Sequence, residues 1–466
     1  ELEAYAQGVE KPLNEVLFAL LLPEVVAAFN KWLPNLMSII PGCSSLFLRD
    51  DKNGGVIHGR ILDYALSGPF EKNERTILYD FDDRYKTFSL GSSGLVYPSL
   101  TSINEKGLTM ALHYKHGRYF NKNGESIFTI TEQLISECSN IREAIKFIKN
   151  KESISYWGIY LSDANNEVAS IDIRGTEIYQ EKFDMNDHQY LYFNNRPLLS
   201  QKDAEGIQPY GNLNQCQARK EIIKNNCKKF NSSESKNIMH ESMKLLSKNS
   251  KLRKANNAKK YQMSPTNLSS IQVCSMSSQL NKFSYIMGQA PKNIKQGIID
   301  IDDLFNTPRF KISTKSRPLD NIEKSQYYLA RYQSYLDLGL ISDAYHCIQM
   351  SLELQKEHEE YFISKFYFLM TQYIYEKDPR EFTYILQNFE SLKEKLPEYL
   401  EDHRKLFVMR LSKILGHGHS YKSSDIQNQY LKKRFIGESS LNSITLKGLK
   451  YLIFPRIEIL DVIYAY

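Results

Sequence analysis

Closely spaced zinc ligands and a disulfide framework are both missing from this sequence. None of the six cysteines forms a Cys-x-x-Cys pair, and only 10 histidines occur in 466 residues. We therefore expect no structural zinc site, and no disulfide framework in a chain of this length. The cysteines are Cys43, Cys138, Cys216, Cys227, Cys274 and Cys347.

Long apolar runs and dense basic stripes are also missing. The most apolar region, residues 16–40, is interrupted by charges at Glu24 and Lys31 and by prolines, whereas a membrane span needs about 20 apolar residues. The formal net charge is +6, without a basic stripe interleaved with aromatic residues, so we expect no nucleic-acid partner. An apolar content of 42% supports a full core, and the length favours two or more domains.

The hydrophobic pattern divides the chain into three segments, which we predict to be residues 1–42, 43–312 and 313–466. The first has helical spacing, the second is mainly β with two helices, and the third is helical. Predicted strands are 44–48, 56–62, 76–79, 108–114, 157–161, 168–173, 177–183, 190–193, 271–276 and 283–287, the last two ending the β region. Predicted helices are 130–150 and 217–228, and the Ser-, Lys- and Asn-rich stretch 230–265 is typical of a mobile surface helix or loop.

The third segment contains one stretch with a recognisable local pattern. Residues 327–354 resemble one unit of a helix-turn-helix repeat of the tetratricopeptide type, with a second helix pair predicted at 361–374 and 380–392. Such arrays need several units to bury a core. A protein partner on these helices is one expectation, and a lid over the functional site is the other.

The chemistry-bearing stretch is residues 39–65, IIPGCSSLFLRDDKNGGVIHGRILDYA, which reads as a hairpin. Cys43 has no conventional base beside it in the sequence. If the chain were cut before Cys43, the freed α-amine would titrate near pH 7.7–8 and could act as that base. Gly42 has no side chain to crowd the attack on its own carbonyl and tolerates a strained geometry.

Two further residues of the hairpin fit a catalytic thiol. Arg60 would hold the thiolate by charge and lower its pKa, and Asp63 would accept hydrogen bonds from the α-ammonium. The alternative is structural, because a single buried strand cysteine is usually inert packing. On these residues alone both interpretations stay open.

The whole stretch resembles the start of mature acid ceramidase and N-acylethanolamine acid amidase, and also choloylglycine hydrolases and fungal penicillin acyltransferase. These are N-terminal-nucleophile (Ntn) hydrolases that use a cysteine, and the resemblance covers roughly residues 1–295. Further ordered blocks are residues 103–114 (INEKGLTMALHY), 160–173, 193–197 (FNNRP), 216–224 (CQARKEIIK) and 271–291. The segment 2–20 also resembles the part that precedes the cysteine in this superfamily.

The resemblance implies roles for particular residues. Asn195, rather than Asn194, would complete the oxyanion hole, together with the backbone N–H of His113 or Tyr114, and Arg219 would be a site arginine. His113 stands where the family usually has Asn. Without the resemblance, Asn195 reads as a turn residue before Pro197 and Arg219 as a solvated helix position. His58 reads as a packed strand residue, and we assign it no catalysis.

The resemblance further implies an α+β fold, a four-layer αββα Ntn-hydrolase sandwich followed by a C-terminal helical domain. Residues 1–42 would be a helical prosegment or small subunit. The implied activity is hydrolysis of a linear amide bond in a lipid-like acyl amide, such as a ceramide, an N-acylethanolamine or another acyl conjugate. This chemistry implies no metal and no cofactor. The rival hypothesis is an inactive Ntn-fold protein that binds a partner through its C-terminal helices. Because the sequence begins at Glu1 rather than Met, we expect a secreted or periplasmic protein, and we make no prediction of oligomeric state.

Overall fold

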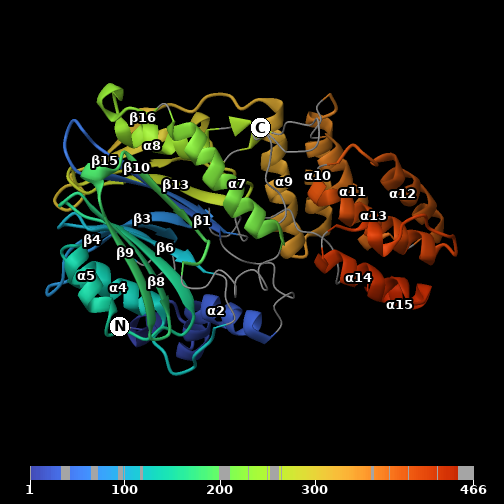
Figure 1. Cartoon of the computed structure of the whole chain (residues 1–466), viewed down its shortest axis with the longest axis horizontal. Helices are drawn as coiled ribbons and strands as arrows, with labels where there is room; N and C mark the ends of the chain where they lie inside the picture. The colour runs from blue at the N-terminus through green and yellow to red at the C-terminus, as the bar shows by residue number, and fades with distance from the viewer. Residues whose placement is uncertain are drawn as a thin grey trace. The chain divides into compact units, whose positions relative to one another are not determined.

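Two antiparallel sheets of seven strands dominate the first part of the computed structural model (Figure 1). Sheet A has the order β10-β1-β2-β13-β14-β15-β16, with bounds Tyr190–Asn194, Gly42–Arg49, Val56–Asp63, Ser270–Ser277, Lys282–Ile286, Ile298–Asp302 and Arg309–Thr314. Sheet B runs in chain order from β3 to β9, with bounds Glu74–Tyr79, Thr87–Ser92, Thr101–Asn104, Thr109–Tyr114, Tyr156–Ser162, Glu167–Arg174 and Glu177–Asp184. A two-stranded ribbon pairs β11 (Ser250–Lys251) with β12 (Gln262–Met263).

The structure describes most of the chain, but not all of it. The described residues are 2–32, 42–64, 72–92, 98, 100–115, 119–198, 210–228, 230–248, 250–251, 262–263, 265–357, 361–376, 378–396, 398–427 and 429–449. Within these ranges, no helix is both long and apolar enough to cross a membrane.

The sheets stack face to face with helices outside them. Phe88 of sheet B packs on Phe283 of sheet A, with ring centroids 5.4 Å apart, in a core of fully buried apolar residues between the sheets. Helices α7 (Tyr210–Cys227) and α8 (Ile238–Ser247) cover the outer face of sheet A. Helices α4 (Ile127–Glu137) and α5 (Ile141–Ile148) lie against sheet B (Figure 1). The predicted αββα sandwich is therefore confirmed.

The single helix predicted over 130–150 is wrong, because two helices occupy that stretch. Asn140 interrupts it by capping α5, where its side chain accepts from the Glu143 amide. Asn104 secures the same break from sheet B, because its Nδ2 donates to the carbonyls of Ile135 and Cys138 at 2.8 Å each. Buried polar anchors thus decide where the helical pattern stops.

Three other predictions in the β region need correction. Helix α8 lies inside the stretch predicted to be a mobile surface segment, yet Met243 and Leu246 are fully buried on sheet A. Strands β15 and β16 follow the pair predicted to be last, and β4 and β5 were not predicted. The boundary predicted at residue 312 falls inside β16, whereas the chain divides into two units after Pro318.

The N-terminal stretch is helical as predicted, with α1 (Leu2–Gly8) and α2 (Leu13–Trp32) in its described part. Glu24 of α2 is buried, and its carboxylate accepts from the Ile127 amide at the start of α4 at 3.0 Å. Ser155 Oγ and Trp157 Nε1 donate to the same carboxylate. Burial raises the pKa of Glu24 against these hydrogen bonds. The Glu24 carboxylate therefore ties α2 to the sandwich through three hydrogen bonds.

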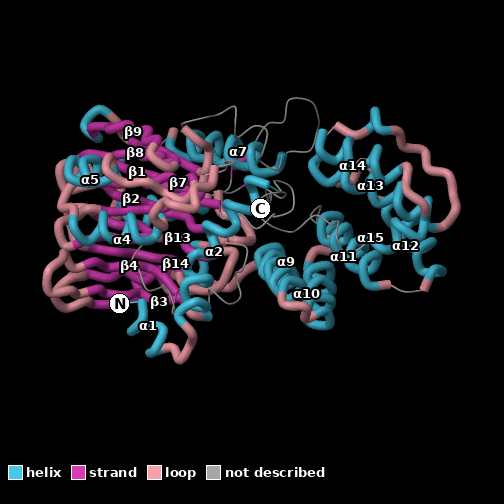
Figure 2. Tube along the Cα trace, turned by 90° about the horizontal axis from the view of Figure 1, so that it is seen from below, coloured by secondary structure: helices cyan, strands magenta, loops and turns pink. Residues whose placement is uncertain are grey.

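The second unit, from Leu319 on, is helical over its described residues (Figure 2). Its helices are α9 to α15, with bounds Asn321–Asp337, Ile341–Leu354, Tyr361–Tyr375, Pro379–Ser391, Glu398–Ile414, Gln429–Ser439 and Ser443–Leu449. The predicted helix pairs fall on α9–α10 and α11–α12, and Gly339 turns between the first two with φ +72°. The buried hydroxyls of Ser325 and Ser351 hydrogen-bond at 2.7 Å across that pair.

Candidate active site

The β1–β2 hairpin places Cys43 and Arg60 on one face of sheet A. Cys43 pairs with Leu62, and Ser45 pairs with Arg60, so these side chains share the face directed at sheet B. Gly42 pairs with Asp63, whose side chain therefore lies on the opposite face, below α7. The hairpin register thus divides the predicted site between the two faces of one sheet.

The thiol and the guanidinium are in direct contact. Arg60 Nη2 lies 3.1 Å from Cys43 Sγ and donates to the Leu112 carbonyl at 2.7 Å. Both side chains are buried. Burial raises the pKa of the Cys43 thiol, and Arg60 opposes that rise. Among the described residues, nothing accepts a hydrogen bond from Nε or Nη1 of Arg60, so the guanidinium keeps spare donors beside the sulfur.

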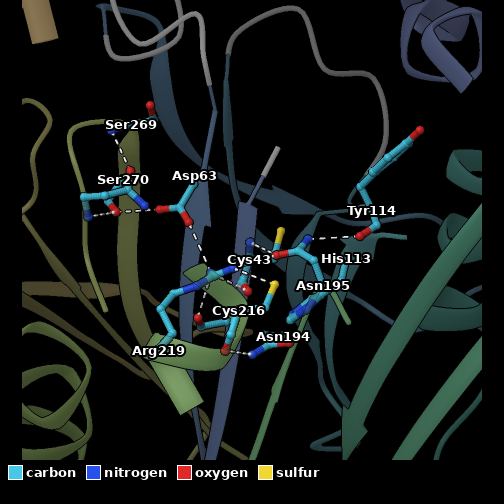
Figure 3. A network of polar contacts seen from close by, with 12 residues as sticks. Cys43, Asp63, His113, Tyr114, Asn194, Asn195, Cys216, Arg219, Ser269 and Ser270 are labelled. Atoms are coloured by element: carbon cyan, nitrogen blue, oxygen red, sulfur yellow. Dashed lines mark hydrogen bonds and ion pairs between the residues drawn. The ribbon is translucent and has the colours of Figure 1, made fainter. Parts of the chain in front are cut away.

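Asn195 and Arg219 meet at the backbone of Cys43 (Figure 3). The Cys43 amide donates to Asn195 Oδ1 at 2.7 Å, and Arg219 Nη2 donates to the same oxygen at 3.1 Å. Arg219 Nη1 donates to the Cys43 carbonyl at 2.9 Å. Asn195 Nδ2 donates to the Tyr114 carbonyl at 2.9 Å. The orientation of the Asn195 amide is thus defined at both ends.

The structure distinguishes the two adjacent asparagines. Asn194 turns away from Cys43, because its Nδ2 donates to the Cys216 carbonyl at 2.9 Å and its Oδ1 accepts from the Arg196 amide at 3.0 Å. Figure 3 shows the two side chains diverging. Asn195 is therefore the asparagine that lies against Cys43, in agreement with the register chosen from the motif.

Asp63 is linked to Cys43 through Arg219, on the far face of sheet A. Its Oδ1 accepts from Ser270 Oγ at 2.5 Å, and its Oδ2 lies 3.4 Å from Arg219 Nη1. Burial raises the pKa of Asp63, while Arg219 and the hydrogen bonds from Ser270 and Asn267 oppose the rise. In this uncleaved chain the Cys43 N–H donates to Asn195. A contact between Asp63 and a freed α-amine therefore stays a prediction for the cleaved form.

The two backbone candidates for the oxyanion hole point in opposite directions. The Lys115 amide donates to Tyr156 of β7 and the Leu112 amide donates to Leu100. Successive amides alternate along a strand, so the His113 amide faces its β7 partner Gly158 and the Tyr114 amide faces away from β7. The carbonyls of Leu112 and Tyr114 meet Arg60 and Asn195 on that second side. Of the two, the Tyr114 amide lies on the side of the site.

The two buried histidines form part of a polar chain between the sheets. Ser45 Oγ is hydrogen-bonded to His113 Nε2 at 2.9 Å and to His58 Nε2 at 3.0 Å, and His58 Nδ1 to Thr109 Oγ1 at 2.9 Å. Burial and the Arg60 charge lower the pKa of both histidines well below the usual value. Both rings are therefore neutral at pH 7.

Two charged residues near the site were not predicted from the sequence. Lys115 follows β6 and Asp172 lies inside β8, and both side chains are fully buried 3.4 Å apart. The sequence held one indication of this pair: Asp172 is a carboxylate inside the apolar strand 168–173, and a buried charge needs a partner. Nothing local identified Lys115 as that partner.

Strand β1 carries a buried cysteine at its second residue, in a sandwich of two antiparallel sheets between helices, and this is the arrangement expected of an Ntn-hydrolase domain. Residues 51–272 match the family model described as Acyl-coenzyme A:6-aminopenicillanic acid acyl-transferase. This match supports the superfamily predicted from the motifs, that of Ntn hydrolases acting on amide bonds. The matched range begins after Cys43.

The solved structures that the chain matches include two proteins. The "Caenorhabditis elegans N-acylethanolamine-hydrolyzing acid amidase (NAAA) ortholog" shares 16% identity and a TM-score of 0.33, covering 51% of this chain and 94% of its own. Penicillin V acylase from Agrobacterium tumefaciens shares 13% identity and a TM-score of 0.35, covering 59% of this chain and 100% of its own. No curated protein sequence matches the chain significantly.

Proposed function

We propose that this protein hydrolyses the linear amide bond of lipid-like N-acyl amides, with Cys43 as an N-terminal nucleophile freed by self-cleavage of the Gly42–Cys43 bond. The observation that carries the proposal is the contact of Cys43 with two groups at once. Its sulfur lies 3.1 Å from Arg60 Nη2, and its nitrogen lies 2.7 Å from Asn195 Oδ1. A nitrogen that is already held becomes a positioned base when the peptide is cut.

The reaction would proceed as acyl transfer. The freed α-amine takes the thiol proton, and the sulfur attacks the amide carbonyl. The oxyanion receives hydrogen bonds from Asn195 Nδ2 and the Tyr114 amide. The α-ammonium returns its proton to the leaving amine, and water then hydrolyses the thioester to the carboxylic acid. Arg60 stabilises the thiolate by charge. The amide substrate and water are the only reactants that these steps consume.

The surroundings of Cys43 support an apolar acyl group. Cys43 packs with Leu62, Ile271 and Ala290, and Tyr64 and Leu100 pack against the same cluster. The resemblance of the opening stretch to the ceramidase branch supports the same class. Ceramides, N-acylethanolamines and other acyl conjugates share the acyl chain on an amide, and the proposal extends to all three.

The experiment combines processing and turnover on one sample. Intact-mass measurement identifies protein cleaved before Cys43, and that material is then assayed on fluorogenic N-acyl amides of graded chain length. Release of fatty acid, absent in a Cys43→Ser variant, supports the proposal. Fully cleaved protein without turnover at any chain length contradicts it and favours the binding protein that acts through its C-terminal helices.

A further inference from the structure

One buried ion pair holds the backbone on both sides of Asn195. Lys115 Nζ donates to the Asn194 carbonyl at 3.1 Å and to the Arg196 carbonyl at 2.8 Å. These carbonyls belong to the residues immediately before and after Asn195. The Lys115 side chain is fully buried, so water does not compete for these bonds.

Asp172 holds the same segment one step further along. Its Oδ1 lies 3.4 Å from Lys115 Nζ, and its Oδ2 accepts from the Leu198 amide at 2.7 Å. Tyr156 OH donates to Oδ2 at 2.7 Å, and Lys115 Nζ reaches Tyr160 OH at 2.6 Å. Residues 194–198 are thus fixed at three backbone groups by two side chains from sheet B.

Strand β7 leaves a passage for this pair. Gly158 pairs with Asp172 on one side and with His113 on the other. A Cβ at Gly158 would lie 2.3 Å from Lys115 Cε and 3.2 Å from Asp172 Oδ1. The glycine is required by the path of the lysine side chain, because any other residue would displace it.

We infer that Lys115 and Asp172 are positioning residues for Asn195, and that they set the oxyanion hole by fixing the backbone that carries the Asn195 amide. The inference rests on the proposed function, because it assigns the pair to that same site. A buried ammonium is expensive to desolvate unless it is paired and fully hydrogen-bonded. Here its hydrogen bonds go to the segment where small displacements affect turnover most.

The decisive experiment is a double-mutant cycle on full-length protein. Lys115→Met keeps the side-chain length but removes the donors, and we expect kcat to fall about 10- to 100-fold with KM little changed. Because Lys115 acts through Asn195, the same substitution should have almost no further effect in an Asn195→Ala background. An equal loss in both backgrounds would overturn the inference.

Lys292→Met is the matched control. Lys292 is also fully buried, pairs with Glu74 Oε2 at 3.0 Å and donates to the Ile286 carbonyl at 3.2 Å. It makes no hydrogen bond to the 194–198 segment in the described structure. A loss of turnover as large as that of Lys115→Met would mean that any buried ion pair has this effect, and would contradict the positioning role.

A milder variant guards against loss of folding. Gly158→Ala keeps Lys115 and Asp172 but displaces the lysine side chain, so it should lower kcat in the same direction. Hydrogen exchange over residues 190–198 should accelerate in both variants, because Lys115 no longer holds the Asn194 and Arg196 carbonyls or fixes Asp172, the acceptor of the Leu198 amide. It should not change in Lys292→Met. If cleaved wild-type protein lacks activity, the proposed function fails. Separately, hydrogen exchange over residues 190–198 that is unchanged in Lys115→Met would overturn the inference about Lys115 and Asp172.

Discussion

Arg219 Nη2 donates to Asn195 Oδ1 at 3.1 Å, and this bond decides which end of the Asn195 amide faces the Cys43 nitrogen. The oxygen is shared by Arg219 and the Cys43 N–H, so the NH2 group is directed to Tyr114. An asparagine NH2 has two donors. Asn195 Nδ2 donates to the Tyr114 carbonyl, and it is this amide group that we assign to the oxyanion.

Asn195→Ala should lower turnover by about 10²- to 10³-fold while the fold stays intact, the usual loss for one oxyanion donor. Steady-state kinetics and circular dichroism measure the two effects. Asn194→Ala is the control, because that side chain bonds to the Cys216 carbonyl and the Arg196 amide instead. A large loss of turnover in Asn194→Ala alone would show that the assignment is off by one residue.

Wild-type protein should cut itself between Gly42 and Cys43, and Cys43→Ala should stay at full length. The reason is that cleavage creates the base that the thiol otherwise lacks. Denaturing gels and N-terminal sequencing check this, with the heavier fragment expected to begin at Cys43. Uncut wild-type protein that still hydrolyses amides would refute the mechanism and require another base.

His113→Asn should weaken the dependence of stability on pH. Burial, with Arg60 and Lys115 nearby, lowers the pKa of His113 well below its usual value. The folded protein thus binds no proton there near neutrality, while an unfolded histidine titrates near pH 6.5. This contribution to stability is complete above about pH 6.5 and is lost as pH falls further, by up to about 1.4 kcal/mol per pH unit.

Urea denaturation of wild type and His113→Asn at about pH 7.5 and about pH 5 tests this difference. Unfolding is followed by tryptophan fluorescence, because both tryptophans lie in the first unit. His403→Asn is the control. Burial also lowers the pKa of His403, to about 3, but this residue lies in the second unit. Identical pH slopes for wild type and His113→Asn would show that His113 is not buried as a neutral ring.

Docking of α2 should be stronger in acid. Burial raises the pKa of the Glu24 carboxyl. The contribution of Glu24 to docking is therefore fully present below its ordinary pKa and is lost as the pH rises through the raised pKa. In cleaved protein, the 1–42 peptide should co-elute on gel filtration better at about pH 5 than at about pH 8. Glu24→Gln, which cannot ionise, should remove most of that difference, and an unchanged difference would exclude Glu24 as its source.

A fragment beginning at Leu319 should fold as a helical unit. Its helices share a buried aromatic core in which Phe389 and Phe407 stack at 5.2 Å, and Arg410 pairs with Glu438 across α13 and α14. Far-ultraviolet circular dichroism of that fragment should show mainly helix with cooperative thermal loss. A spectrum without helix would reject this unit as a domain.

Local pattern determined much of the fold. Alternation in residues 44–48 and 56–62 predicted β1 and β2, and the Gly-rich turn between them predicted their pairing. That pairing alone brings Arg60 to the same face as Cys43, as its diagonal neighbour, because Cys43 pairs with Leu62 and Ser45 pairs with Arg60. The helical spacing of the 327–354 stretch likewise predicted α9 and α10. Helix 130–150 was wrong because Asn140 caps a second helix within it, and the break is secured by Asn104, which lies in another element.

The sequence by itself therefore determined the hairpin, the helical second unit and, through its motifs, the set Cys43, Arg60, Asp63, Asn195 and Arg219. The tertiary structure decided the geometry. It placed Asp63 with Arg219 on the far face of sheet A, directed the Tyr114 amide rather than that of His113 toward the site, and buried Lys115 against Asp172. Periodicity reports which face of a strand is buried, but not its neighbours. Contacts such as Cys43 with Asn195, 152 residues apart, are fixed only by how sheets and helices pack.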